Sequence, residues 1–129
     1  NVTNETTINV ITEGLINLGL LQGEITDLIA SEAHREFYMH GAGHWLGMDV
    51  HDVGDYKIDG EWRIYEPGMV VTIEPGIYIS KHNMRVDEKW RGIGVRIEDD
   101  IMITKTGNKN LTSGVPKSRK AIEELMIKI

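Results

Sequence analysis

The chain has 129 residues, of which 40% are hydrophobic and 26% are charged, and its formal net charge is −6 at pH 7. This composition indicates a globular protein of one domain, or a piece of a larger one. The acidic balance argues against a nucleic-acid or anionic-membrane partner, because both favour a basic face. The absence of cysteine excludes disulfides, thiolate zinc sites and a cysteine nucleophile, and it favours a reducing compartment such as the cytoplasm.

The first two predicted elements are helices. Apolar side chains recur at helical spacing in residues 6–21 and again in residues 23–37, with a glycine between the two patterns. The inward-facing residues are Ile8, Ile11, Leu15 and Leu18 in the first helix and Ile25, Leu28 and Ile29 in the second. The candidate N-caps of the first helix are Asn4 and Thr6.

Turns and one short strand are predicted next. Residues 53–63 are typical of a surface loop, and residues 80–92 of a polar, irregular loop. Two Glu-Pro-Gly tripeptides, at 66–68 and 74–76, enclose the apolar run 69–73. Proline followed by glycine suits the central positions of a type II turn, so a turn is expected on each side of a buried strand.

The last third of the chain predicts a strand and a helix. Residues 93–104 alternate and indicate one long strand. One face carries Val95, Ile97, Asp99, Ile101 and Ile103, and the other carries Arg96, Glu98, Asp100 and Met102. Residues 107–114 are typical of a linker, and a final helix has Ile122, Leu125, Met126 and Ile129 at helical spacing. Helices, then strands, then a helix indicate an α+β fold.

Histidines gather in the stretch HGAGHWLGMDVHD, residues 40–52. It holds three of the five in the chain, namely His40, His44 and His51. Histidine is the commonest metal ligand and the usual proton carrier near neutral pH. Their clustering with Asp49 and Asp52 favours a functional site over hydrogen-bonded histidines beside tight turns. His34 and His82 are expected on the surface.

Two glutamates are candidates to join these histidines. Glu74 follows the apolar run and precedes a proline that keeps it extended, so it either points into a cleft or flanks a surface turn as Glu66 does. Glu98 either belongs to a solvated strand face or ligates a metal, with Arg96 orienting a carboxylate or substrate. One histidine with several carboxylates suits manganese and tolerates cobalt, iron or zinc. Two such metals bridged by a glutamate would activate water for attack on a carbonyl, which predicts a metallohydrolase.

Four stretches, taken in order, resemble the catalytic domain of the Xaa-Pro aminopeptidase (aminopeptidase P) family. They are FYMHGAGHWLGMDVHDVG, EPGMVVTIEPGIYI, RGIGVRIEDDIMIT and GNKNLTSGVPKS. The resemblance covers nearly the whole chain and implies the pita-bread fold, with helices packed on a curved, mainly antiparallel sheet. It places residues 1–129 in the C-terminal half of that domain. The family's N-terminal domain and the first half of its catalytic domain, with two aspartate ligands, precede this region.

The resemblance also implies a role for each candidate residue. The metal ligands are His44, Glu74 and the bridging Glu98. The catalytic residues are His40, His51 and Arg96, and the substrate-binding residues are His40, His51, Tyr78 and Arg96. The chain thus carries three of the five protein ligands of two divalent metal ions, which are expected to be manganese, with cobalt, iron or zinc as alternatives.

For the complete protein, the resemblance implies a cytoplasmic, homo-oligomeric metallopeptidase with no nucleic-acid or membrane partner. It would release the N-terminal residue from peptides with proline in second position, using a hydroxide activated by the two metals. The 129-residue chain alone is expected to bind metal weakly and to show little or no activity. Two alternatives remain open: a prolidase-type dipeptidase, and a non-catalytic binding module with the same fold.

Overall fold

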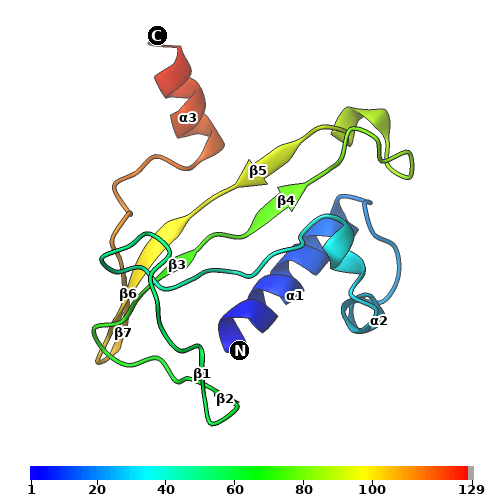
Figure 1. The fold of residues 1–129 in the computed structure, drawn as a ribbon. Helices are drawn as coiled ribbons and strands as arrows, with labels where there is room; N and C mark the ends of the chain where they lie inside the picture. The colour runs from blue at the N-terminus through cyan, green and yellow to red at the C-terminus, as the bar shows by residue number, and fades with distance from the viewer. Residues whose placement is uncertain (128–129) are drawn as a thin grey trace. The chain divides into compact units, whose positions relative to one another are not determined.

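The structure of the protein is a computed structural model, which describes residues 1–127. Helices and antiparallel strand pairs make up two compact units, whose elements are labelled in Figure 1. Unit 1 joins Asn1–Gly43 to Glu74–Arg96, and unit 2 joins His44–Ile73 to Ile97–Ile129. No helix in the described part of the chain is long and apolar enough to cross a membrane.

Unit 1 begins with the helix α1, Val2–Asn17. This helix starts earlier than predicted, because the side chain of Asn1 accepts a hydrogen bond from the backbone N–H of Asn4 and caps it. The predicted second helix is split into α2, Ile25–Ala30, and a 3₁₀ turn, η1, Ala33–Glu36. The Ser31 hydroxyl bonds back to the carbonyls of the preceding turn, and Glu32 adopts a left-handed φ of 54°. Both features end a helix.

The core of unit 1 forms around the inner face of α1. Its buried side chains are Ile11, Leu15, Phe37, Tyr38, Ile79 and Val86. His34 is also buried, at 4% exposure, so its predicted surface position is wrong. The early end of α2 explains the error. His34 lies in the 3₁₀ turn that follows, where side chains point in directions other than those that a continuing α-helix would give them.

The strands of unit 1 are β4, Gly76–Tyr78, and β5, Gly94–Arg96, which pair antiparallel with Gly76 opposite Arg96. Between them, the predicted polar loop contains the 3₁₀ turn η2, Glu88–Trp90. The loop is exposed at His82 as expected, but Val86 is buried in the core. The Arg91 guanidinium donates two hydrogen bonds to the Val86 carbonyl and thereby fixes the loop.

Unit 2 contains a three-stranded antiparallel sheet in the order β3-β6-β7. Its strands are β3, Val70–Ile73; β6, Asp99–Thr104; and β7, Gly107–Asn110. The helix α3, Arg119–Met126, follows, and its N-cap Ser118 accepts from the Ala121 N–H. It includes three of the four predicted apolar residues, and the fourth, Ile129, lies outside the described residues. All three are exposed.

Two segments predicted as irregular contain strands. β7 lies within the predicted linker 107–114, and a small hairpin lies within the predicted loop 53–63. The hairpin pairs β1, Lys57–Ile58, with β2, Glu61–Trp62. Its connection is Asp59-Gly60, with φ values of 51° and 87°. Two positive φ values in a two-residue Asp-Gly loop characterise a tight hairpin turn.

The predicted strand 93–104 is interrupted. Ile97 and Glu98 separate β5 from β6, and the boundary between the two units falls at Ile97. β5 pairs with β4 and β6 pairs with β3 and β7, so the two halves have different partners.

The two Glu-Pro-Gly tripeptides also differ. The Met69 N–H donates to the Glu66 carbonyl and Gly68 has φ of 97°, which confirms the first turn. The second tripeptide instead leads into β4. A side chain at Gly76 would collide with the Tyr78 hydroxyl, because its Cβ would lie 2.5 Å from that oxygen. Glycine is therefore needed at 76 for close approach rather than for a type II turn.

Candidate functional site

His40, in unit 1, is held at both ring nitrogens. Its Nδ1 lies 2.8 Å from the Gly41 carbonyl oxygen. A carbonyl can only accept, so Nδ1 carries the proton. In the neutral ring Nε2 is then an acceptor, and it lies 3.1 Å from the hydroxyl of Tyr78, which donates to it. The donor and acceptor exchange roles when Nε2 takes up a proton, so this pair can hold or pass a proton.

Glu74 directly follows β3, and its side chain is only 13% exposed. The Glu74 N–H donates to the Ala42 carbonyl over 2.7 Å, and its Oε2 lies 3.5 Å from Nη1 of Arg96. Arg96 is 52% exposed, so solvent screens this ion pair and its contribution to stability is small. Its effect is to orient the carboxylate, which is largely buried rather than displayed on a surface turn.

His44, in unit 2, is anchored by Thr72 of β3. The His44 N–H donates to the Thr72 hydroxyl over 3.0 Å, and the Thr72 N–H donates to the His44 carbonyl over 2.9 Å. The His44 Nδ1 lies 2.8 Å from the Trp45 carbonyl oxygen, so Nδ1 carries the proton and Nε2 is the lone-pair nitrogen. A metal-ligating histidine is commonly oriented by such a bond from its other nitrogen. The ring of His51 meets that of His44 edge-on, with centroids 4.1 Å apart.

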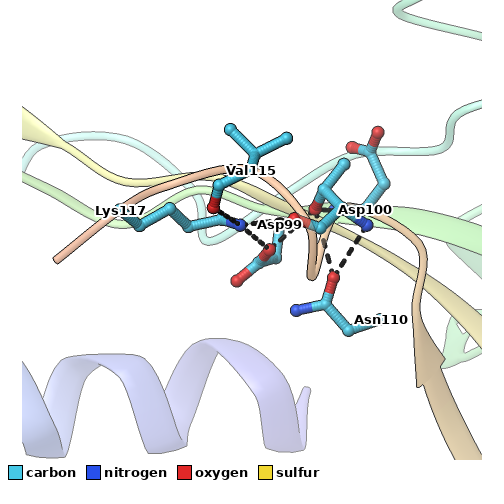
Figure 2. Close-up of polar contacts among 6 residues, drawn as sticks. Asp99, Asp100, Asn110, Val115 and Lys117 are labelled. Carbon is cyan, nitrogen blue, oxygen red and sulfur yellow. Dashed lines mark hydrogen bonds and ion pairs between the residues drawn. The ribbon is translucent and has the colours of Figure 1, made fainter. Parts of the chain in front are cut away.

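Glu98 is exposed, and the residue after it is firmly held. The Asp99 carboxylate accepts from the Thr112 hydroxyl over 2.7 Å. It also pairs with the Lys117 ammonium over 2.9 Å (Figure 2). Lys117 also donates to the carbonyls of Thr112 and Val115. The hydrogen bonds from Thr112 and Lys117 lower the pKa of Asp99 to about 2. This network fixes the start of β6, immediately after Glu98.

The seven predicted site residues are divided between the two units. Unit 1 holds His40, Glu74, Tyr78 and Arg96, and unit 2 holds His44, His51 and Glu98. Within the units, His40 contacts Tyr78, Glu74 contacts Arg96, and His44 contacts His51. Within residues 1–127, no three histidine, aspartate or glutamate side chains form a group that could hold a metal ion.

Three buried polar residues beside this set were not predicted. Thr72 is 1% exposed, and its signal in the sequence was a lone polar residue inside an apolar run. Tyr38 is 2% exposed and meets the His40 ring edge-on, with centroids 4.9 Å apart. Burial raises the pKa of Tyr38 to about 12, and Glu74 adds to the effect. For His34, burial is the main cause that lowers the pKa.

Known proteins resemble this chain over most of its length. Residues 3–105 match the metallopeptidase family M24. The Xaa-Pro aminopeptidase of Escherichia coli is 56% identical over 120 residues, which cover 93% of this chain and 27% of that protein. The structure of Pseudomonas aeruginosa aminopeptidase PepP is 61% identical with a TM-score of 0.93, and the match covers 97% of this chain and 28% of that one.

A further structure, zinc-substituted Escherichia coli aminopeptidase P in complex with product, is 55% identical with a TM-score of 0.86. That match covers 94% of this chain and 27% of the other, so the chain spans less than a third of the length of these relatives. The structural matches confirm the predicted α+β pita-bread fold. This chain belongs to the metallopeptidase family M24.

Proposed function

We propose that residues 1–129 form the C-terminal part of the catalytic domain of a metal-dependent aminopeptidase. The complete protein would release the N-terminal residue from peptides with proline in second position. Relatives named Xaa-Pro aminopeptidase support this substrate class. The observation in the chain itself that supports it most is His44, whose Nδ1 bond to the Trp45 carbonyl leaves Nε2 as the lone-pair nitrogen.

The residues that would hold metal in this proposal are His44, Glu74 and Glu98, with Glu98 as the bridging residue. By themselves they form no group that could hold a metal ion within residues 1–127. An imidazole and carboxylates form a hard donor set that suits manganese and tolerates zinc, cobalt or iron. The zinc-substituted relative supports tolerance of zinc. Two aspartates outside this chain would complete the set. Bound by these residues, two divalent ions would supply Lewis-acid chemistry, namely polarisation of the scissile carbonyl and a lowered pKa of a water molecule.

The other residues act on substrate and protons. The Nε2 of His40 and the hydroxyl of Tyr78 share one hydrogen bond, so a proton accepted at Nε2 reverses the bond without moving either side chain. Arg96 holds the Glu74 carboxylate in one orientation and leaves about half of its own side chain exposed for substrate. His51 lies against the His44 ring and is exposed, where it can contact substrate.

The decisive experiment compares the complete protein with the 129-residue chain. Release of the N-terminal residue from an Xaa-Pro-Xaa tripeptide is measured with and without manganese, and an Xaa-Pro dipeptide tests for the prolidase-type activity. We expect the complete protein to cleave the tripeptide only with metal, and the chain to be inactive with weak metal binding. Replacing His44 by Asn should abolish activity, whereas the same change at exposed His82 should not.

Three results would contradict the proposal. A complete protein that cleaves neither peptide with any divalent metal would favour a non-catalytic binding module. Preference for the dipeptide would favour a prolidase-type enzyme. Tight binding of two metals by the chain alone would show that three ligands suffice.

We also propose that the complete protein is a cytoplasmic homo-oligomer. Sedimentation velocity would test its oligomeric state, and cell fractionation would test its compartment.

A further inference from the structure

Four rings follow one another through unit 1. His34 and Tyr38 have centroids 6.5 Å apart, Tyr38 and His40 4.9 Å, and His40 and Tyr78 5.5 Å. The contact between Tyr38 and His40 is the closest of the three and is edge-on, with 70° between the ring planes. Tyr38 is therefore the buried residue whose ring directly contacts His40, a residue of the proposed site.

The Tyr38 ring cannot move easily. It is 2% exposed and belongs to the core cluster with Leu15, Phe37 and Ile79. Close-packed interiors leave little room for a side chain to change rotamer. His40 is only half-buried, so the rigid partner in this contact is the tyrosine.

The two hydrogen bonds of His40 restrain its ring nitrogens. They join Nδ1 to the Gly41 carbonyl over 2.8 Å and Nε2 to the Tyr78 hydroxyl over 3.1 Å. The ring can still rotate about its Cβ–Cγ bond by lengthening these bonds. An edge contact from a fixed ring restricts that rotation on one side of the imidazole.

The Tyr38 hydroxyl does not provide the restraint. It is buried without a hydrogen-bond partner among the described residues, so the ring alone makes the contact. Because burial and Glu74 raise its pKa to about 12, the hydroxyl stays neutral at working pH.

We propose that Tyr38 is a positioning residue whose ring fixes the imidazole plane of His40, so that Nε2 stays in hydrogen-bond reach of the Tyr78 hydroxyl. The kinetic test of this proposal rests on the proposed aminopeptidase function. The structural test, which observes the His40 ring directly, does not depend on that function.

The kinetic test uses the complete, metal-loaded protein and matched variants. Tyr38→Phe keeps the ring and should retain kcat within about twofold, whereas Tyr38→Leu should lower kcat about tenfold or more with little change in KM. Phe37→Leu removes an equally buried ring from the same core, and kcat per folded molecule should be unchanged. In a His40→Ala background, Tyr38→Leu should cause no further loss, because its effect passes through His40.

The second measurement is ¹⁵N NMR of the His40 ring. The wild type and Tyr38→Phe should show one Nδ1-protonated tautomer, and Tyr38→Leu should show averaged or broadened ring signals. Equal kcat losses in Tyr38→Leu and Phe37→Leu, a further loss in the His40→Ala background, or unchanged ring signals would each overturn the proposal. If the wild type has no peptidase activity, the proposed function fails, and the NMR result still decides whether Tyr38 positions His40.

Discussion

The two units hold their candidate site residues by different means. In unit 1 the two hydrogen bonds of His40 are backed by side-chain packing, because Phe37 and Tyr38 are almost completely buried and Tyr38 lies against the His40 ring. In unit 2 the support is polar: Thr72 bonds to both backbone groups of His44, and charged and hydroxyl groups hold Asp99 beside Glu98.

This difference predicts how each unit responds to substitution. Packing is non-directional and its loss scales with the cavity left behind, so a core change should loosen unit 1 broadly. Hydrogen bonds are directional, and removing one partner leaves the other buried and unsatisfied. A polar change in unit 2 should therefore act locally, on the residue that it anchored.

The largest expected effect is a core truncation in unit 1. Leu15→Ala removes a completely buried side chain from the core and should cost about 2–5 kcal/mol in the free energy of unfolding. Urea denaturation measures the cost, and hydrogen exchange by mass spectrometry shows where it falls. The control is Val10→Ala on the same helix, where the side chain is 64% exposed and the cost should be far smaller. If Leu15→Ala reduced protection from hydrogen exchange equally in both units, the proposed difference between the two units would be contradicted.

A smaller effect is expected from the polar network of unit 2. Lys117→Met keeps the aliphatic stem but removes the ammonium that contacts Asp99 and two backbone carbonyls. The side chains of Lys117 and Asp99 are 20% and 29% exposed, so we expect a cost of about 1–2 kcal/mol, below that of a fully buried charge pair.

The matched control for Lys117 is Lys120→Met. Lys120 is 86% exposed and pairs with Glu124 across one turn of α3, an arrangement worth about 0.3–0.5 kcal/mol. Urea denaturation midpoints of the two variants give the comparison directly. Similar small shifts in both would mean that the enclosed network around Asp99 is no stronger than a surface ion pair.

Thr72→Val tests the backbone anchor of His44. The substitution keeps the shape but removes the hydroxyl that accepts from the His44 N–H, and should cost about 1 kcal/mol. Amide exchange at His44 should accelerate more than exchange elsewhere in β3. The control is Thr106→Val, at an exposed turn position. Unchanged protection at His44 would show that the hydroxyl does not anchor it.

The sequence predicted elements well where one pattern decides the structure. The inner face of α1 follows from its helical spacing at Ile8, Ile11 and Leu15, although the predicted Leu18 lies just beyond the helix and is 49% exposed. β3 follows from an apolar run beside a Pro-Gly turn. Alternation in residues 93–104 indicates extended backbone but not its partners, so the division between β5 and β6 was not visible. β7 is polar and largely exposed, and β1–β2 is only two residues per strand, so neither has an apolar pattern.

The candidate site was likewise predicted only in part from the sequence. The resemblance of its motifs names His44, Glu74 and Glu98, but motifs do not report contacts between distant residues. The bonds between Thr72 and His44, and the ion pair between Arg96 and Glu74, each join residues more than 20 positions apart. Such pairings depend on strand register, which the sequence alone leaves open.

The smallest expected effect concerns His34, the histidine wrongly predicted on the surface. Burial, with the Arg35 charge, lowers its pKa below the ordinary 6.5, and Glu32 opposes this only in part. Below pH 6.5 the unfolded chain therefore binds a proton that the folded chain does not. This contribution to stability is complete above pH 6.5 and is lost as the pH falls toward the folded pKa.

Urea denaturation of the wild type, His34→Gln and His82→Gln between pH 5 and 8 isolates this contribution. The midpoint should fall less steeply with acidification in His34→Gln than in the wild type. His82 is exposed, so His82→Gln should keep the wild-type slope. If His34→Gln also keeps that slope, His34 takes up its proton equally in both states. Its ring must then reach solvent more freely than 4% exposure allows. The side chains around His34 would in that case be packed more loosely than those of the unit 1 core beside α1.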